Sequence, residues 1–405
     1  MGSQADGEVG MTTRRDIIAS SLGLASAALP GMSVLAADYG RGMDGRLMRL
    51  PKLDLESHDA FLTTIRVWAN TDLAKAARNR ATALMQAKGM DPFKAATRAD
   101  MIALMENDPL IMTHANTWLR NQELMWKVLR TELYSRADFY LSEMESADKA
   151  GPGALEVNPR MELPAYTKEE IHMMPGGYVG DELAGHMYHY GTNNFWMGEN
   201  YQDGVHIGLA KETPVPQDGK VKRILDLGCS CGQLTVALKE RFPNAEVWGI
   251  DAGGPMARYA HMRASRMKNG ANFAQRLAED THFPDNHFDI VTSFILFHEV
   301  HPDAEPKIMS EVNRVLRPGG VFYPIEGRMR RPAPPTSAFG VFNSWWIRRW
   351  NYEVWNEHYA VADYPAILAK AGFVVTDNAA SRDNGAGNNN VIGSGTANIM
   401  GTKKA

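Results

Sequence analysis

Apolar positions between residues 57 and 150 recur every three or four residues, as in Phe61, Ile65 and Trp68 and again in Leu119, Leu124 and Val128. That spacing is typical of amphipathic helices. Asp91-Pro92 and Asp108-Pro109 interrupt the pattern, as expected at boundaries between helices. The pattern therefore predicts a helical domain of about three or four helices. With its linker, this domain covers residues 37–160.

From Val221 onward, short apolar runs alternate with helical patterns. The predicted strands are 221–227, 246–250, 289–293 and 320–325, and the predicted helices between them are 234–241, 255–268 and 304–316. Such alternation predicts an α/β fold with a doubly wound, mostly parallel sheet. Two further strands are expected at 373–376 and 397–400, so this domain covers residues 221–405.

The segment between the two domains has a different composition. Residues 171–201 are dense in aromatic side chains, glycine and histidine. This composition suits loops and short helices better than a regular element. We therefore expect residues 161–220, called the lid segment below, to cover a site on the second domain.

Residues 11–36 resemble a twin-arginine export signal. Arg14 and Arg15 precede Ile17 and Ile18, and small residues lead to a candidate cleavage site after Ala36. With residues 1–10 as a leader, residues 1–36 are left out of the fold, and a periplasmic location is expected. The alternative is a cytoplasmic protein with an N-terminal extension. Neither this apolar run nor a later one is long enough to predict a membrane span.

Composition excludes several classes of protein. The 405 residues are 44% hydrophobic, which is too apolar for a disordered chain. The 43 basic and 47 acidic residues give a net charge of −4, which disfavours a nucleic-acid partner. The two cysteines, Cys229 and Cys231, are too few for a disulfide scaffold or a cysteine-rich zinc scaffold.

Candidate chemistry begins where the first strand of the second domain ends. The turn Asp226-Leu227-Gly228-Cys229-Ser230-Cys231-Gly232 leads directly into a helix. Glycine-rich turns of this kind let backbone amides approach an anionic group. Asp251 ends the next strand, where a carboxylate can accept hydrogen bonds from ribose hydroxyls. These two features alone suit a nicotinamide, a flavin or another adenosine cofactor.

Further blocks distinguish these alternatives. They are Ile224–Cys229, Gly249-Ile250-Asp251 with Met256, Ala278-Glu279-Asp280, Phe283–Val291 and Glu311–Gly320. In this order and spacing they resemble the class I S-adenosylmethionine-dependent methyltransferases, in particular the small-molecule group that includes quinone methyltransferases. The resemblance covers Ile224–Glu326 closely. It implies a Rossmann-like sheet of seven strands, the last of them antiparallel, and S-adenosylmethionine as the cofactor.

The resemblance also implies a set of cofactor-binding residues. Asp226 and Gly228 would hold the methionine end, Asp251 the ribose, and Phe294 would pass near the methionine amino group. The full set is Asp226, Gly228, Cys229, Gly232, Asp251, Ala252, Met256, Ala278, Glu279 and Phe294. The sequence departs from the family pattern at Ser230, which replaces a glycine, and at Leu277, which replaces an acidic residue near adenine.

The catalytic candidates follow the fourth strand. We expect His298, assisted by Glu299, to take the acceptor's proton. The alternative is that both cap the next helix or bridge to the lid segment. Glu326 is a second candidate base, and Tyr178 and Tyr188 are candidates for positioning the acceptor.

No metal site is expected. Cys229 and Cys231 lack a second cysteine pair, and the spacings His298/His301 and His186/His189 are more typical of lid or cleft residues.

The aromatic insertion at residues 333–360 contains Trp345, Trp346, Trp350 and Trp355. Such residues could form an aromatic wall for a planar or cationic acceptor. The alternative, which we favour, is that they pack against the N-terminal helices.

The sequence therefore predicts a methyltransferase that acts on a small-molecule oxygen, sulfur, nitrogen or carbon acceptor. A nicotinamide- or flavin-dependent oxidoreductase is the alternative, although the Leu316–Gly320 block disfavours it. A non-catalytic cofactor-binding module is a third hypothesis. The helical domain is the expected surface for a homo-oligomer.

Overall fold

The computed structural model describes residues 43–48, 50, 52–92, 94, 97–326, 338–359, 361–377 and 399–404. These residues belong to one compact unit, Arg41–Ala405. The predicted export signal at residues 11–36 lies outside the described residues, so the periplasmic location stays a prediction. Among the described residues, no helix has both the length and the apolar character needed to cross a membrane.

An eight-stranded sheet occupies the centre of this unit, in the order β3-β6-β5-β4-β7-β8-β10-β9. Its strands are β3 (Leu155–Glu156), β4 (Arg223–Leu227), β5 (Glu246–Asp251), β6 (Asn272–Gln275), β7 (Phe288–Phe294), β8 (Leu316–Ile325), β9 (Phe373–Asp377) and β10 (Ile399–Lys403). All pairs are parallel except those that β10 makes with β8 and β9. The expected α/β doubly wound sheet with an antiparallel last strand is confirmed, and the short β3 extends it at one edge.

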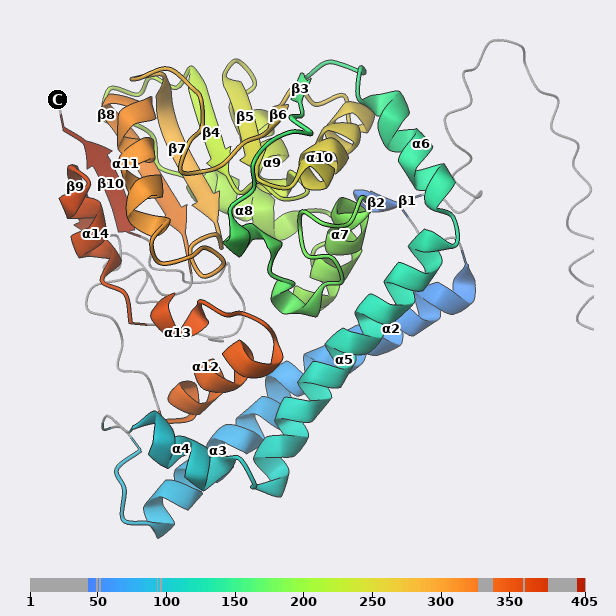
Figure 1. Ribbon diagram of the computed structural model, residues 1–405, viewed down its shortest axis with the longest axis vertical. Coiled ribbons are helices and arrows are strands. Elements are labelled where there is room, and N and C mark those ends of the chain that lie inside the picture. The colour runs from blue at the N-terminus through green and yellow to red at the C-terminus, as the bar shows by residue number, and fades with distance from the viewer. Residues whose placement is uncertain are drawn as a thin grey trace, which may run out of the picture. The chain divides into compact units, whose positions relative to one another are not determined.

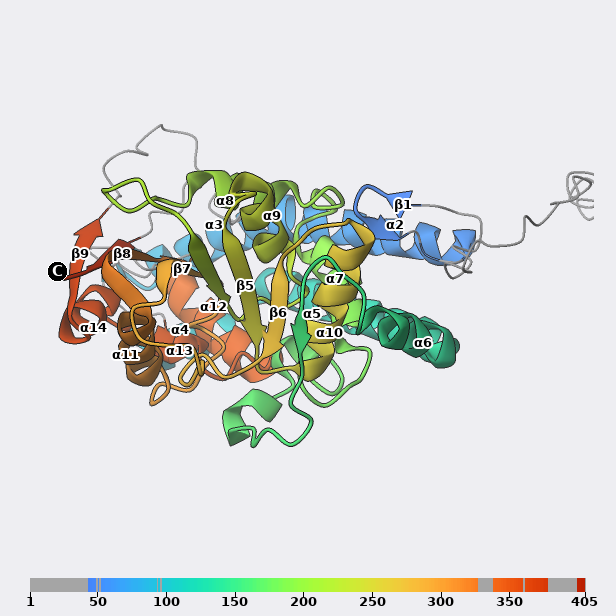
Figure 2. The same cartoon turned by 90° about the horizontal axis from the view of Figure 1, so that it is seen from above.

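Helices cover both faces of the sheet (Figure 2). On one face lie α8 (Gly204–Glu212) and α9 (Gln233–Arg241), with α10 (Gly254–Arg266) beside α9. On the other face lie α11 (Glu305–Val315) and α14 (Tyr364–Lys370). Side chains alternate along a strand, so Ile224 packs in the core with α9 whereas Leu225 packs in the core with α11. Burial on both faces explains why these strands read as apolar runs.

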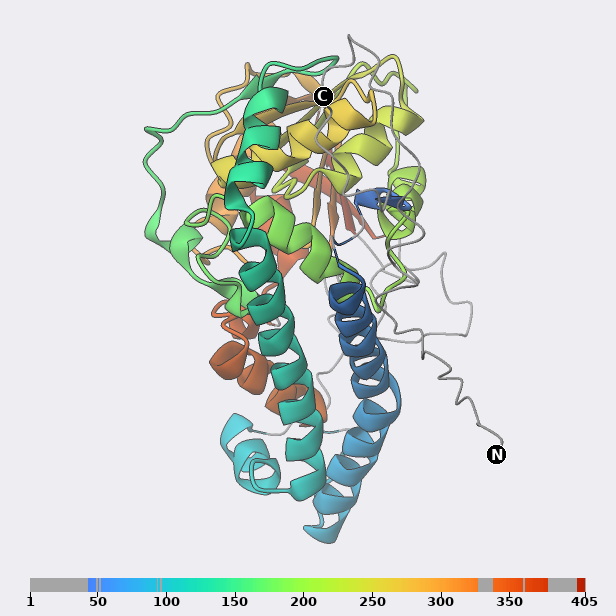
Figure 3. The ribbon, with the colours of Figure 1, turned by 90° about the vertical axis from the view of Figure 1, so that its right-hand side faces the viewer.

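The N-terminal segment is helical, as its periodicity predicts. It contains α2 (Leu53–Trp68), a π-helical turn η1 (Ala69–Leu73), α3 (Ala74–Ala87), α4 (Arg98–Met105), α5 (Pro109–Tyr134) and α6 (Ala137–Ala147). Helices α2 and α5 run side by side (Figures 1 and 3). Asp108 starts α5, because its Oδ1 accepts the amides of Leu110 and Ile111 at 3.1 and 3.2 Å.

The lid segment contains two short 3-10 helices, η2 (Ala165–Lys168) and η3 (Ile171–Met173), followed by α7 (Ala184–Phe195). Helix α7 is buried between α5 and α10. A Cβ at Gly191 would lie 2.3 Å from the Trp126 ring, and one at Gly185 would lie 2.3 Å from Cβ of Tyr259. Glycine is therefore required for this close approach of α7 to both neighbours.

The aromatic insertion forms α12 (Ala338–Trp350) and α13 (Asn356–Tyr359) over the described part of its range. Trp345 and Trp346 are buried in a core shared with α3, α4 and α5. Trp346 meets Trp118 of α5 edge-on, with ring centroids 5.9 Å apart. For these two residues, packing against the N-terminal helices is confirmed. A short hairpin of β1 (Met43–Asp44) and β2 (Leu47–Met48) precedes α2.

Candidate active site at the carboxyl ends of the strands

A pocket opens at the carboxyl ends of β4, β5, β6 and β7, on the side that the lid segment covers. The space between its walls, including its open mouth, is about 1120 Å³. Ligands of open α/β sheets bind outside the carboxyl ends of the strands, near the point where the strand order reverses. Here that point lies between β4 and its neighbours β5 and β7.

The turn after β4 forms the floor of the pocket. Gly228, Ser230 and Gly232 have φ values of 62°, 51° and 75°, all in the left-handed region. A side chain at Gly228 would also meet Leu296, whose Cδ1 lies 2.8 Å from an ideal Cβ. Ser230 takes the same strained backbone as the glycines, so it preserves the turn at some conformational cost.

Asp251 at the end of β5 is held by two backbone amides. Its Oδ2 accepts from Ser230 N at 2.9 Å, and its Oδ1 accepts from Gly253 N at 2.8 Å. Burial raises the pKa of Asp251 to about 6, against the lowering effect of the two amides. Each oxygen retains a lone pair for a further donor. The carboxylate is thus fixed in the pocket wall and able to accept hydrogen bonds.

Asp226 at the end of β4 lies next to this turn and also lines the pocket. Its Oδ2 accepts a hydrogen bond from the Thr235 hydroxyl at 2.6 Å. Burial raises the pKa of Asp226 to about 7. Two carboxyl groups therefore lie in this part of the pocket, and both are ionised under mildly alkaline conditions.

The remaining walls are mostly apolar. The structure places Cys229, Ala252, Met256, Ala278, Glu279 and Phe294 among the lining residues, together with Leu277. Glu279 accepts a hydrogen bond from Tyr166 OH at 2.8 Å, and Phe294 stacks on Trp196 of the lid segment at 5.7 Å between ring centroids. Gly232 lies behind the wall, where a Cβ would come within 2.8 Å of Ala260. Its role is to close the turn.

The two cysteines are free and buried in the turn. Both line the pocket. Burial raises the pKa of Cys231 to about 12 and that of Cys229 well above its usual range. Both thiols are therefore protonated at neutral pH, which makes them small apolar wall residues.

Glu299, Tyr178 and Tyr188 also line the pocket. Tyr178 OH donates to Glu299 Oε1 at 3.0 Å, and the Tyr188 ring meets the Tyr178 ring edge-on at 5.5 Å. Burial raises the pKa of both tyrosines well above the usual range. The phenols are neutral, and that of Tyr178 serves as a donor that orients Glu299.

His298 and Glu326 lie behind Glu299 and are not among the pocket-lining residues. His298 Nδ1 is 3.3 Å from Glu326 Oε2, and its Nε2 is 3.7 Å from Glu299 Oε1. Burial lowers the pKa of His298, but Glu326 outweighs this effect and raises it to about 9. Glu326 is also fixed through its Oε1, which accepts the Phe297 amide at 2.7 Å. Of the predicted pair, Glu299 is the member that faces the pocket.

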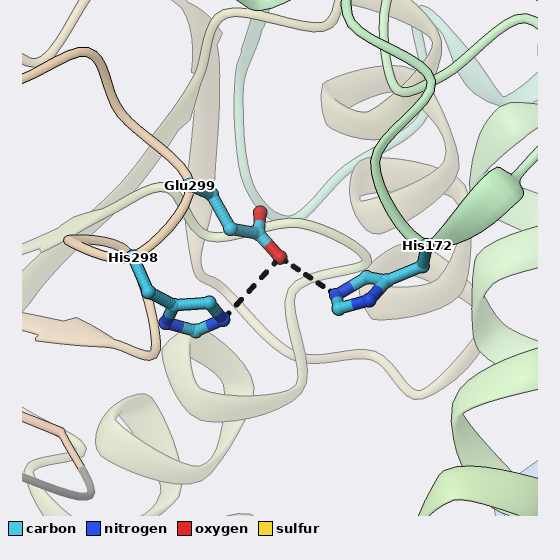
Figure 4. Close-up of side chains that lie close together, drawn as sticks. All are labelled: His172, His298 and Glu299. Atoms are coloured by element: carbon cyan, nitrogen blue, oxygen red, sulfur yellow. Dashed lines mark hydrogen bonds and ion pairs between the residues drawn. The ribbon is translucent and has the colours of Figure 1, made fainter. Parts of the chain in front are cut away.

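His172 of η3 completes this cluster, and sequence reasoning missed it. Its Nε2 is 3.0 Å from Glu299 Oε1, and its Nδ1 is 3.3 Å from Glu353 Oε1 (Figure 4 shows the contact with Glu299). Burial lowers the pKa of His172, but the two carboxylates outweigh it and raise the pKa to about 10. The one cue was its position at the start of the stretch 171–201, which is rich in aromatic side chains, glycine and histidine. Nothing in the sequence pairs it with Glu299 or Glu353.

Comparison with known proteins supports the assignment of the second domain. A sequence model described as a methyltransferase domain matches residues 224–320. An uncharacterized methyltransferase of Synechocystis is 32% identical over 160 residues, which cover 38% of this chain and 68% of the relative. The demethylmenaquinone methyltransferase of Thermus thermophilus is 41% identical over 120 residues, which cover 30% of this chain and 52% of the relative.

A fatty-acid O-methyltransferase of Mycolicibacterium smegmatis is 33% identical over 128 residues, which cover 32% of this chain and 45% of that protein. The chain thus spans between about half and two thirds of the lengths of these relatives. Among solved structures, a methyltransferase of Methanococcus maripaludis is 14% identical, with a TM-score of 0.38 and coverage of 56% of this chain and 94% of that one.

The lining residues suit S-adenosylmethionine. Asp251 has lone pairs available for ribose hydroxyls, and the turn at Gly228 lets backbone approach the bound molecule. Met256 and Ala278 provide an apolar surface for a purine ring. The strand order, the turn after β4, the matched methyltransferase domain and the relatives all indicate the same family. The chain belongs to the class I S-adenosylmethionine-dependent methyltransferases.

Proposed function

We propose that the protein methylates the hydroxyl or phenol oxygen of a small molecule that binds between the cofactor and Glu299. The observation that carries this proposal is the environment of Glu299. Its carboxylate lines the same pocket as Asp251, contacts His172 and Tyr178 of the lid segment, and is near enough to Asp251 to raise the pKa of that carboxyl. A carboxylate at that position selects an acceptor that can donate a hydrogen bond.

The two oxygens of Glu299 differ in their partners. Oε1 meets His172, Tyr178 and His298 at 3.0, 3.0 and 3.7 Å. Among the residues that the structure describes, Oε2 has no hydrogen-bond partner. In Figure 4 it points away from both imidazole rings. Oε2 is therefore available to accept the hydrogen of an acceptor hydroxyl.

S-adenosylmethionine supplies an electrophilic methyl group on its sulfonium. The chain's own residues then align the acceptor and keep water out. In this proposal Asp226 and the turn bind the methionine end, and Asp251 binds the ribose. Tyr178 holds Glu299 in position by donating to Oε1, and Phe294 under Trp196 closes the apolar wall.

The relatives are named for oxygen and for carbon acceptors alike, so the choice of oxygen rests on the pocket of this chain. One of them is named as an O-methyltransferase of fatty acids, and another as a methyltransferase of demethylmenaquinone. The pocket of this chain combines mostly apolar walls with the Glu299 carboxylate, whose Oε2 has no partner among the described residues. That combination favours an apolar molecule with a single hydroxyl or phenol at the reacting end.

The test is the Glu299→Gln variant, which keeps the shape of the side chain and removes its charge. With a panel of phenols and hydroxy acids, we expect turnover to fall about 100-fold or more, because proton acceptance in the transition state contributes on that scale. Affinity for S-adenosylhomocysteine, measured by calorimetry, should stay within about threefold, because Glu299 contacts the acceptor. Glu162→Gln, an exposed glutamate of the lid segment, is the matched control.

Unchanged turnover in Glu299→Gln would show that this carboxylate does not bind the acceptor. Binding of S-adenosylhomocysteine by the wild-type chain without turnover of any panel member would favour a cofactor-binding module over an enzyme that acts on hydroxyl groups.

A further inference from the structure

Two imidazole rings converge on one carboxylate oxygen beside the pocket (Figure 4). His172 Nε2 and His298 Nε2 lie 3.0 and 3.7 Å from Oε1 of Glu299. One ligand atom from each of the three side chains lies within 4.8 Å of the other two. Two histidine nitrogens and one carboxylate oxygen are a recurrent ligand set for zinc and for iron(II).

The other nitrogen of each imidazole ring, Nδ1, faces a second carboxylate. His172 Nδ1 is 3.3 Å from Glu353 Oε1, and His298 Nδ1 is 3.3 Å from Glu326 Oε2. Metal-bound histidines commonly donate their other N–H to a carboxylate, which fixes the tautomer and leaves the opposite nitrogen to the metal. The same arrangement occurs here twice, and both rings present Nε2 to the same point.

These outer carboxylates are themselves buried and fixed. Glu353 is 8% exposed, and it accepts from Asn351 at 2.6 Å and Asn356 at 2.8 Å. Glu326 is 1% exposed and accepts the Phe297 amide. The orientation of both imidazoles is therefore set by the surrounding structure, as a metal site requires.

The spacing of the three ligand atoms suits a small ion. Tetrahedral zinc lies about 2.0–2.1 Å from its nitrogen and oxygen ligands, which places the ligands about 3.4 Å apart. The distances of 3.0 and 3.7 Å from Oε1 bracket that value. Side-chain adjustments of about 1 Å therefore suffice to bind an ion among them.

The backbone at His172 is strained, which is common where a side chain is held for function. His172 and Met173 have φ values of 59° and 56°, both left-handed. The carbonyl of His172 accepts from Trp126 Nε1 at 2.8 Å and from Gln122 Nε2 at 2.7 Å. Helix α5 thus holds this strained residue beside the pocket.

We propose that His172, His298 and Glu299 bind one divalent transition-metal ion such as zinc, cobalt or iron(II), which displaces the Nε2 proton of each imidazole into solvent. This differs from the expectation of no metal, which considered His298 only with its neighbour in sequence, His301. Because Glu299 lines the pocket, the ion would lie in the pocket wall, with one coordination position for an oxygen of the acceptor. This last point rests on the proposed function, whereas the ion site itself does not.

The experiment is a titration of the metal-free full chain with Co²⁺, followed by its visible ligand-field absorption and by competition with Zn²⁺. We expect saturation at one Co²⁺ per chain. His172→Ala and His298→Asn should each weaken binding by about 100-fold or more, and Glu353→Gln by about 10- to 100-fold, because it orients a ligand. His301→Ala is the matched control, since it removes a half-exposed imidazole of the same loop, and it should bind Co²⁺ as the wild type does.

A wild-type chain without saturable Co²⁺ binding overturns the site. The site is also overturned if both histidine variants, folded by circular dichroism, bind Co²⁺ as tightly as the wild type. Because the absorption does not depend on methyl transfer, the two proposals fail separately. An inactive chain that binds Co²⁺ through these residues supports the metal site and counts against the proposed function. An active chain that does not bind Co²⁺ contradicts the metal site alone.

Discussion

The amide nitrogen of Ser230 donates a hydrogen bond to Oδ2 of Asp251 over 2.9 Å, which connects the turn after β4 to the end of β5. Ser230 makes this bond in a left-handed conformation, with φ of 51°. The backbone conformation at this position favours glycine. Ser230 nevertheless adopts it, and its amide holds the Asp251 carboxylate in place. The turn and the carboxylate form one structural unit, and changes to either should affect both.

Substitutions at Ser230 should separate backbone strain from side-chain contacts. We expect Ser230→Val to lower the free energy of unfolding by about 1–2 kcal/mol, because a β-branched residue is poorly accommodated at positive φ. Ser230→Gly should stay within about 1 kcal/mol of the wild type, since relief of strain is offset by the greater freedom of the unfolded chain. Urea unfolding measures the free energy of unfolding of both variants.

Ser310 on helix α11 is the control, because it is exposed and its backbone is helical. There the order should reverse, with glycine the more destabilising substitution. Equal stabilities of the Val and Gly variants at Ser230 would contradict the role assigned to its backbone.

The affinity for S-adenosylhomocysteine should depend on pH. Burial raises the pKa of Asp251 to about 6 and that of Asp226 to about 7. Both pKa values are raised, so each carboxyl is protonated on acidification earlier than an ordinary aspartate and loses acceptor capacity. The affinity for S-adenosylhomocysteine is therefore highest above about pH 7. It weakens as the pH falls, by up to about tenfold per pH unit for each carboxyl group that becomes protonated.

Calorimetry between about pH 5 and pH 8 measures this dependence. The groups that face Asp251 are Asp226, Glu299, Tyr188 and Cys229, of which the last two are neutral over that range. In Asp251→Asn the portion of the pH dependence near pH 6 should disappear, and the portion due to Asp226 should move below pH 7, because the Asp251 charge helps to raise the pKa of Asp226. Affinity that rises on acidification would contradict the assignment of these carboxylates to the cofactor.

Helix α7 should tolerate no side chain at Gly191. A Cβ there would lie 2.3 Å from the Trp126 ring, so we expect Gly191→Ala to lower the free energy of unfolding by about 1–3 kcal/mol through overpacking. Gly208 of α8 has nothing within 4 Å of an ideal Cβ. Gly208→Ala should therefore raise stability by about 0.5–1 kcal/mol. Thermal unfolding of both variants measures these changes in stability. A Gly191→Ala chain that is more stable than the wild type would argue against the close contact between α7 and α5.

The sequence predicts most strands of the sheet because burial on both faces makes them continuous apolar runs, as in Arg223–Leu227, but it does not identify the short β3 and β6. It predicts helices in the N-terminal segment, but it does not identify their buried face. Phe61 and Trp68 are 61% and 44% exposed, whereas Leu62 and Arg66 are buried. Periodicity identifies the element, and the packing partners decide which face is covered.

The cofactor pocket was predictable because its residues occur in ordered blocks at the ends of consecutive strands. The cluster around Glu299 was only half predictable. His298 and Glu299 are neighbours in sequence, whereas His172 is 127 positions from Glu299. Glu353 belongs to the aromatic insertion, where the tryptophans were the conspicuous residues. Contacts between a lid segment and an insertion depend on the folded arrangement, which no local pattern encodes.

The most direct test of the central claim is calorimetric titration of the full chain with S-adenosylhomocysteine, compared with Asp251→Asn and with the exposed control Asp303→Asn. We predict one binding site per chain in the wild type and in the control. In Asp251→Asn, loss of charge-assisted hydrogen bonds worth about 1.5–3 kcal/mol should weaken affinity about 10- to 100-fold. A wild-type chain that does not bind, or an Asp251→Asn chain that binds as tightly as the wild type, would contradict the cofactor site described above.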